Sequence, residues 1–333
     1  MQTLTLTQAA WWNLRQLGLV QPFSSAEETV RSLVAVQAQD YAAAKQAVAA
    51  RTVGEEQLDS LVQPGGPLLR MWTVRGTMHL VLAADAPDHQ AATEAEWSQR
   101  WGRYLERRLP IPLAEVRQRI YPRIRDVLGE QPLTHVEISV RAGLERPYDS
   151  LLPHLLKDLC YLGDCVRGPQ KGNRAVYFSS WYQPLPQDSA WPAKRRLIGR
   201  FIARYGPVTL ADVVYWSGFR VPVVRQLLKE IQPQLATVRL EEQSDEAYLL
   251  AEQLPELLDS PGPRQDLQHY LPAFDVLLLA YKDKRRFLSD THVPCVFRSA
   301  ARVYPILLHN TRVIGTWQGK PPQVTLFEDG RPD

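Results

Sequence analysis

The sequence predicts an α+β protein in which three winged helix-turn-helix modules follow one another and a small β unit ends the chain. Two observations support this prediction. A pattern of helices followed by a short hairpin recurs along residues 1–258, and two helices joined by a turn and followed by a hairpin wing are typical of a winged helix. After a Pro- and Gly-rich stretch at 258–266, short apolar runs alternate with turn signals, a pattern typical of β-strands.

The second module is the clearest copy of the pattern. Residues 113–128 have apolar side chains at helical spacing, and Pro122 is expected to kink or shorten this helix. Thr134, three residues before a glutamate, predicts a capping box at the start of the next helix. A helix over 148–163 and a strand, Gly-rich turn and strand over 165–180 complete the module.

The other two copies follow the same order. In the third, Thr209 caps a short helix, 221–235 is the candidate recognition helix and 236–251 forms the wing. The first copy is looser. Its expected elements are helices near 5–18, 25–36, 42–51 and 55–62, and a hairpin over 68–83.

The sequence predicts β-strands in the C-terminal unit. The runs at 270–281, 294–320 and 322–328 are apolar, with a turn at Asn310, so we expect a small sheet or barrel. Asp275 lies inside the first run, and we expect it to pair with an arginine or cap a turn rather than take part in catalysis. We accordingly place the domains at residues 1–108, 109–188, 189–258 and 265–333.

The composition is that of an ordinary globular protein. Hydrophobic residues make up 45% of the 333 residues and charged residues 23%, and the length corresponds to about two to four compact units. We find no secretory signal and no apolar run of the roughly 18 residues that a membrane span needs. The seven histidines and three cysteines lack metal-ligand spacing. We therefore expect a cytoplasmic protein with no metal and no cofactor.

Arginine is concentrated in a few places although the net charge is only +3. Basic clusters lie at 100–108, 193–206 and 281–287. Because guanidinium groups bind phosphates in a bidentate manner, such clusters fit a nucleic-acid surface. The alternative is a solvated helix face on which each arginine has an acidic neighbour.

Two glutamines, Gln37 and Gln39, stand on either side of one alanine. On a helix, positions i and i+2 point about 200° apart, whereas in an extended segment they share a side. If the two amides act together, the helix that begins near Ala26 must end around Ala35 or Val36, and the next helix must begin after it. The alternative is a frayed helix end with two solvated glutamines.

The sequence QAQ at 37–39 resembles the Gln-aliphatic-Gln motif of AlkZ-like DNA glycosylases. Asp40 lies one position beyond the acidic residue of the related YcaQ-like branch, which has Gln-aliphatic-Asp, so the chain is similar to the Gln/Gln branch. The resemblance covers essentially the whole chain. Further similar stretches lie at 74–80, 205–218, 270–287 and 312–317.

The resemblance implies three tandem winged helix-turn-helix modules with a small C-terminal β-barrel. It also implies a monofunctional DNA glycosylase that hydrolyses the N-glycosidic bond of bulky N7-alkylated purines, some of them in interstrand crosslinks. Gln37 and Gln39 would be catalytic. An N7-alkylated guanine is already cationic and leaves easily, so two amides that place a water molecule suffice, whereas an unmodified base also requires an acid.

Other residues are candidates for contacts with the lesion or the DNA. Arg75, Thr77 and His79 share one parity in the second half of the first hairpin, which would place Arg75 at a phosphate and His79 near the lesion. The alternative is that Arg75 forms the hairpin turn and that His79 is structural. Asp40 is expected chiefly to cap the next helix, although it stands beside the catalytic motif.

Phosphate contacts are expected from the later modules. Lys171 and Arg174 lie in the second wing, and Arg225 lies in the third recognition helix. The expected partner is double-stranded DNA with alkylated bases, bound by a monomer associated with the nucleoid. The alternative function is that of a non-catalytic winged-helix DNA-binding protein or transcriptional regulator.

Overall fold

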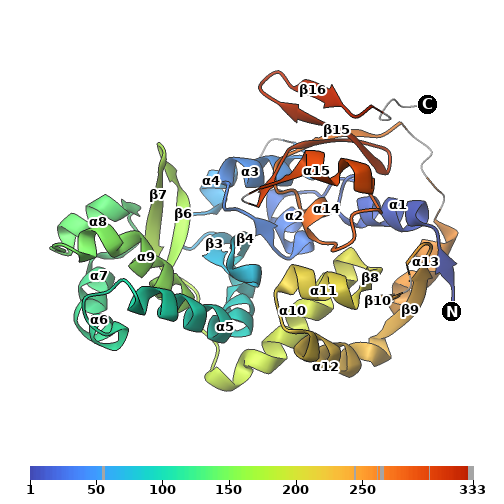
Figure 1. Cartoon of the computed structure of the whole chain (residues 1–333). Helices are drawn as coiled ribbons and strands as arrows, with labels where there is room; N and C mark the ends of the chain where they lie inside the picture. The colour runs from blue at the N-terminus through green and yellow to red at the C-terminus, as the bar shows by residue number, and fades with distance from the viewer. Residues whose placement is uncertain (55–56, 244, 261, 263–265, 300, 329–333) are drawn as a thin grey trace. The chain divides into compact units, whose positions relative to one another are not determined.

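The computed structural model describes residues 1–54, 57–243, 245–260, 262, 266–299 and 301–328. Helices and strands are mixed along the chain, which confirms the α+β class (Figure 1). The chain forms two compact units: Met1–Glu56 with Arg195–Asp333 is unit 1, and Gln57–Lys194 is unit 2. Residues 261 and 263–265 of the predicted linker, and 329–333 at the end of the last predicted domain, lie outside the described residues.

Unit 2 contains a hairpin, a helical layer and a second hairpin. Strands β4, β3, β6, β7 and β5 lie side by side in that order. The elements in chain order are α4 (Leu58–Leu61), β3 (Leu68–Trp72), β4 (Met78–Leu82), α5 (Ala86–Glu106), α6 (Leu113–Arg119), α7 (Tyr121–Val127), β5 (Leu133–Thr134), α8 (His135–Arg141), α9 (Tyr148–Tyr161), β6 (Cys165–Lys171) and β7 (Arg174–Ser179).

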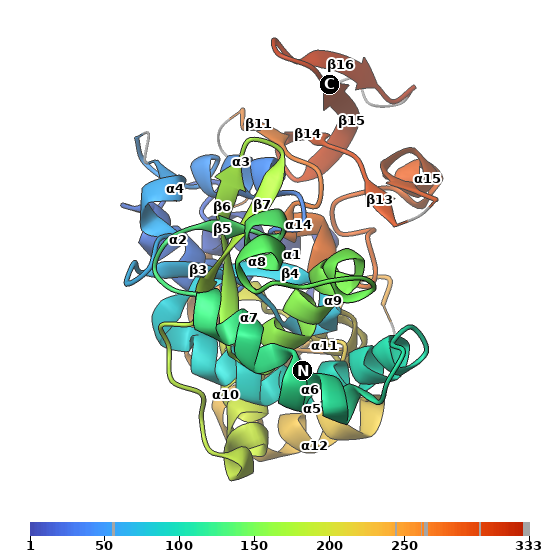
Figure 2. The ribbon, with the colours of Figure 1, turned by 90° about the vertical axis from the view of Figure 1, so that its left-hand side faces the viewer.

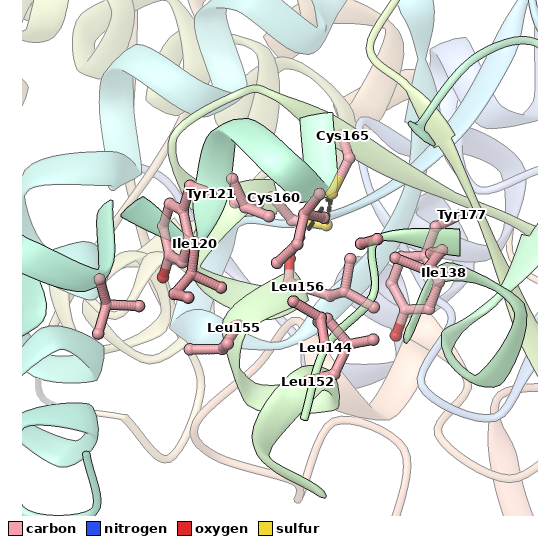
Figure 3. Packing of buried hydrophobic residues seen from close by; sticks show 14 of the residues in the cluster. Ile120, Tyr121, Ile138, Leu144, Leu152, Leu155, Leu156, Cys160, Cys165 and Tyr177 are labelled. Atoms are coloured by element: carbon pink, nitrogen blue, oxygen red, sulfur yellow. Dashed lines mark hydrogen bonds between the residues drawn. The ribbon is translucent and has the colours of Figure 1, made fainter. Parts of the chain in front are cut away.

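The core of unit 2 forms around α9. Leu152 and Leu156 of this helix are fully buried against Tyr177 of β7 and residues of α7 and α8 (Figure 3). Burial of this apolar surface supplies the main driving force for folding. The thiols of Cys160 and Cys165 also lie in this core, with their Sγ atoms 3.2 Å apart.

The helix predicted at 113–128 is broken as expected. One helix ends at Arg119, the next begins at Tyr121, and Pro122 occupies its first turn. A proline is tolerated there because the amide groups of a first turn have no partner within the helix. The predicted capping box of α8 is also present, with Thr134 as N-cap.

Unit 1 combines the start of the chain with its second half. Strand β1 (Thr3–Leu4) pairs in parallel with β9, giving a sheet with the order β1-β9-β10-β8. The remaining elements of this part are α1 (Leu6–Gln16), α2 (Ala26–Leu33), β2 (Val36–Gln37), α3 (Tyr41–Ala49), α10 (Ala190–Tyr205, which begins in unit 2), β8 (Val208–Thr209), α11 (Leu210–Ser217), α12 (Val221–Ile231), β9 (Leu235–Leu240), β10 (Glu246–Leu250) and α13 (Leu254–Asp259).

The second and third copies of the predicted pattern share one arrangement. In each, a threonine that ends a short strand caps the following helix: Thr134 begins α8 and Thr209 begins α11. The short strand then pairs with the second strand of the hairpin, β5 with β7 and β8 with β10. The helices and hairpins of both copies therefore occur in the predicted order.

The C-terminal strands form an open sheet. β11 (Gln268–Leu271), β14 (Ile306–His309), β15 (Arg312–Gln318) and β16 (Gln323–Leu326) pair antiparallel in that order, and β16 lies at the outer edge (Figure 2). A small pair, β12 (Phe297–Arg298) and β13 (Arg302–Val303), lies beside α15 (Val293–Val296). The closed β-barrel expected from the sequence is therefore absent from the described residues.

One reason for this difference is that the run at 270–281 is not a continuous strand. Phe274 has a positive φ of 60°, and Asp275 then caps a helical turn, α14 (Val276–Leu279). A short apolar run fits a buried helix as well as a buried strand, so its periodicity could not distinguish them. Among the described residues no helix combines the length and the apolar character needed to cross a membrane.

The expected structural role of Asp275 is confirmed. Its carboxylate accepts two hydrogen bonds from the guanidinium of Arg51, at 2.7 and 2.9 Å, and both side chains are at most 1% exposed. Asp275 also accepts from the backbone N–H of Leu277. The ion pair therefore joins the end of α3 to the start of α14.

Replacing Asp275 by alanine is predicted to lower the free energy of unfolding by about 3–5 kcal/mol, because the charge of Arg51 would remain buried without its partner. Urea denaturation followed by circular dichroism measures the change. Asp266→Ala is the control, since the Asp266 side chain is 86% exposed. A D275A variant as stable as D266A would contradict this role.

Candidate active site

The segment that carries the two glutamines begins with a strained turn. Helix α2 ends at Leu33, and Val34 then has φ 66° and ψ −51°. The backbone N–H of Ala35 donates to the carbonyl of Leu33 at 2.7 Å, so the three residues form a γ-turn with positive φ, which is rare. A β-branched residue in this conformation costs about 1–3 kcal/mol, and such strain concentrates at functional sites.

A buried network holds this turn in place. The hydroxyl of Tyr205, at the end of α10, donates to the carbonyl of Leu33 at 2.9 Å. The backbone carbonyl of Tyr205 in turn accepts from the amide of Asn13 at 3.0 Å and from the hydroxyl of Tyr281 at 2.9 Å. The side chains of Tyr205, Asn13 and Tyr281 are all buried. The end of α2 is therefore fixed by residues from three distant parts of unit 1.

After the turn the backbone is extended, as the two amides require. Val36 and Gln37 form strand β2. Val36 and Ala38 are 1% and 0% exposed, whereas Gln37 is half-buried and Gln39 is exposed. Gln37 lies in β2 on the side opposite Val36, and Gln39 lies in the bend that precedes α3. The alternative of a frayed helix end is therefore wrong, because α2 ends before Val34.

Asp40 begins the next helix. Its carboxylate accepts a hydrogen bond from the backbone N–H of Ala43 at 3.1 Å, which makes it the N-cap of α3. The expected capping role is thereby confirmed. A γ-turn at one end and a helix cap at the other limit the conformations open to the glutamine segment.

The hairpin of β3 and β4 places three candidates at one turn of unit 2. Arg75 and Gly76 both have positive φ, 57° and 65°, and form a short 3-10 turn. A side chain at Gly76 would meet the ring of Trp97 at 2.7 Å, so this position requires glycine. The alternative in which Arg75 and Gly76 form the turn is confirmed, and the turn interrupts the strand alternation between Arg75 and His79.

His79 is buried and neutral. Its Nδ1–H donates to the carbonyl of Thr77 at 3.0 Å, which leaves Nε2 to accept from the guanidinium of Arg75 at 3.4 Å. The pKa of His79 is well below its usual value because burial penalises the charged imidazolium and because Arg75 adds a second positive charge. The ring therefore orients Arg75 and carries no charge of its own.

The three basic candidates of the later modules lie on the surface. Lys171 and Arg174 pair across the turn of the β6–β7 hairpin. Lys171 also forms an ion pair with Glu137 at 2.9 Å, whereas Arg174 and Arg225, the latter on α12, are exposed. Among the described residues no group of three or more His, Cys, Asp or Glu could hold a metal ion.

Two functional features were missed in the sequence. The residue type at position 34 does not indicate the strained conformation, because valine rarely adopts a positive φ. The contact between Tyr205 and Leu33 joins residues 172 positions apart, a separation that no local pattern reports. The single sequence contains no signal for the strain at Val34 or for the contact between Tyr205 and Leu33.

Comparisons with known proteins agree on one family. The family model described as "DNA glycosylase AlkZ-like" matches residues 30–326. A relative from Streptomyces sahachiroi, "Interstrand DNA cross-link repair glycosylase", is 25% identical over 331 residues, covering 93% of this chain and 86% of the relative. The structure of Streptomyces sahachiroi DNA glycosylase AlkZ has a TM-score of 0.76 at 23% identity, covering 99% of this chain and 92% of that chain.

His79 is predicted to stay neutral, with the proton on Nδ1, between about pH 5 and 8. Nitrogen-15 NMR of the imidazole ring measures both properties. In the Arg75→Gln variant the pKa of His79 should rise but stay below its usual value, because burial lowers this pKa more than the charge of Arg75 does. Because the folded-state pKa is depressed, the contribution of His79 to stability is present above about pH 6.5 and declines as the pH falls. Titration at the usual value would contradict this description.

Proposed function

The chain belongs to the AlkZ-like DNA glycosylase family, whose model matches residues 30–326, and on that premise we propose that Gln37 and Gln39 are its catalytic residues. The protein is a hydrolase of the N-glycosidic bond in DNA. Its substrates are bulky N7-alkylated purines in double-stranded DNA. The name of the relative from Streptomyces sahachiroi supports including bases in interstrand crosslinks.

The proposed substrate class follows from what amides can do. A glycosylase must stabilise the departure of the base and supply water to C1′ of the sugar. An N7-alkylated purine carries a positive charge and leaves as a neutral base, so no acid has to protonate it. An amide cannot act as a base near pH 7, but its oxygen can orient a water molecule by accepting a hydrogen bond.

The two glutamines would together hold one water molecule. Each amide oxygen accepts one O–H of the same water, whose oxygen then forms a bond to C1′ as the bond from C1′ to the base nitrogen breaks. The electron pair of that bond neutralises the purine, and the water loses one of its two protons to solvent and keeps the other in the new hydroxyl on C1′. The partial negative charge of the amide oxygens also stabilises the oxocarbenium-like sugar.

One observation supports this proposal: α2 ends at Leu33, so that Gln37, in β2, and Gln39, in the bend before α3, both lie outside the helices and neither is buried. Val36 and Ala38 are buried, the strained turn at Val34 precedes the glutamine segment and the Asp40 cap follows it. The segment therefore holds the two amides in a fixed relation before DNA binds, as catalysis by positioning requires.

The remaining candidates bind DNA in this proposal. Arg75, oriented by His79, contacts a phosphate, and Thr77 supports the turn by donating to the carbonyl of Val74 at 3.2 Å. Arg174 and Arg225 are exposed and would contact phosphates farther along the duplex. Lys171 would do so after leaving Glu137, because a surface ion pair contributes only about 0–1 kcal/mol.

We also keep the finer architecture as a proposal. Residues 109–188 and 189–258 would be winged helices, since each has the helix, short strand, two helices and hairpin of that fold. Residues 1–108 would be a third and more divergent copy. The protein would act as a monomer at the nucleoid in the cytoplasm, and its chemistry would require neither a metal nor a cofactor.

Replacing Gln37 or Gln39 by alanine is predicted to slow release of N7-methylguanine from duplex DNA by about 10²-fold, the cost of a misplaced reactant. The double variant should be little slower than the slower single variant, because both amides hold one water molecule and their effects are not additive. Single-turnover kinetics with excess enzyme measure the rates.

Gln118→Ala is the matched control for these variants, because Gln118 is an exposed amide on α6 outside the proposed site. The control should keep the wild-type rate. A Q37A/Q39A variant as fast as Q118A would end the assignment, and strictly multiplicative effects would show that the two amides do not share one water.

The single-turnover rate is predicted to be constant between about pH 6 and 8, because amides do not titrate and His79 is already neutral in this range. The measurement follows release of N7-methylguanine across this interval, with correction for spontaneous loss of the base. A bell-shaped profile would instead indicate a titrating acid and base, and would contradict catalysis by two amides.

A further inference from the structure

The second half of α5 and the two residues that follow it carry a row of basic side chains that the proposed active site does not use. These residues, Arg100, Arg103, Arg107 and Arg108, are all exposed. None of them forms an ion pair with any residue that the structure describes. The carboxylate among them, Glu106, accepts a hydrogen bond from the backbone N–H of Leu113 instead.

Two other exposed arginines in unit 2, Arg119 and Arg125, do have acidic partners. Arg119 pairs with Glu115 one turn away on α6, and Arg125 pairs with Asp164 at 2.7 Å. Those two arginines fit the alternative of a solvated helix face with acidic neighbours. The four arginines at and just after the end of α5 do not fit this alternative, because none of them has an acidic partner among the described residues.

Aromatic rings hold several cations in place beside this row. The guanidinium of Arg108 lies 3.6 Å from the ring centroid of Tyr104, and Tyr104 stacks on Trp101 at 4.5 Å. On α9, the ammonium of Lys157 lies 4.1 Å from the ring centroid of Trp101. Because cations already lie close to both rings, the rings orient charges rather than offer a free platform for a base.

Positive charge accumulates here without being neutralised. Burial lowers the pKa of Lys157 to about 8, and the structure describes no carboxylate that pairs with it. The pKa of His154 is lowered by burial and further by the charges of Arg108 and Lys157. An anion bound at this surface would stabilise the charged forms of Lys157 and His154.

We propose that the α5 surface, formed by Arg100, Arg103, Arg107, Arg108 and Lys157, binds the phosphate backbone of double-stranded DNA. Arg100 and Arg107 are seven residues apart, which is about 10 Å along a helix and corresponds to about three base-pair steps along the duplex axis, at about 3.4 Å each. The partner follows from the proposed function, in which duplex DNA carries the substrate. The contact itself is independent of excision, because it needs no damaged base.

The test is the double variant Arg103→Gln/Arg107→Gln, which changes two exposed side chains. Fluorescence anisotropy measures binding of the full-length protein to an undamaged, labelled 25-base-pair duplex over a range of salt concentrations. Each lost phosphate contact should reduce the slope of log K against log salt by about 0.9. We therefore expect a slope smaller in magnitude by about 2 and an affinity about 10- to 100-fold weaker near 0.1 M salt.

The matched control is Arg119→Gln/Arg125→Gln, which removes the same charge from the same unit at arginines that already have acidic partners. It should keep the wild-type slope and lose less than about threefold in affinity. An unchanged slope in R103Q/R107Q, or equal losses in the two variants, would overturn the proposal. Failure of the proposed function would appear separately, as duplex binding with this salt dependence but no release of alkylated bases.

Discussion

The structure of the site depends on the backbone reversal at Val34. Were α2 to continue for about two more turns, Gln37 and Gln39 would point in different directions and no single water molecule could contact both. The γ-turn at Val34 ends α2 at Leu33. The hydroxyl of Tyr205 donates a hydrogen bond to the backbone carbonyl of Leu33. A strained, buried valine thus ends the helix just before the strand that contains Gln37.

In the proposed mechanism, this constraint explains how two amides can catalyse the reaction. An amide is neither an acid nor a base near neutral pH, so its contribution has to come from position and partial charge. Position is what the segment supplies, since Val36 and Ala38 are packed and Asp40 caps α3. The same weakness sets the substrate class, because only a base that is already cationic leaves without protonation. The lesion therefore provides the activation that the protein lacks.

Much of the fold could be predicted from the sequence where a local physical rule applies. Capping boxes at Thr134 and Thr209 and the break before Pro122 lie where spacing and capping chemistry place them. For the glutamine segment, the spacing of the two amides predicted an end of the helix only on the condition that they act together. The conformation of the apolar run around Asp275 could not be predicted, because buried helices and buried strands have the same pattern there. Long-range contacts such as Tyr205 to Leu33 could not be predicted, because nothing local records them.

The most direct measurement is a crystal structure of the protein bound to duplex DNA that carries a cationic aza-sugar in place of the damaged nucleotide, a mimic of the oxocarbenium-like sugar. The account predicts one ordered water within about 2.6–3.2 Å of the amide oxygens of both Gln37 and Gln39, on the face of the sugar opposite the departing base. A complex in which the two amides face away from the sugar, or in which a carboxylate alone holds that water, would contradict it.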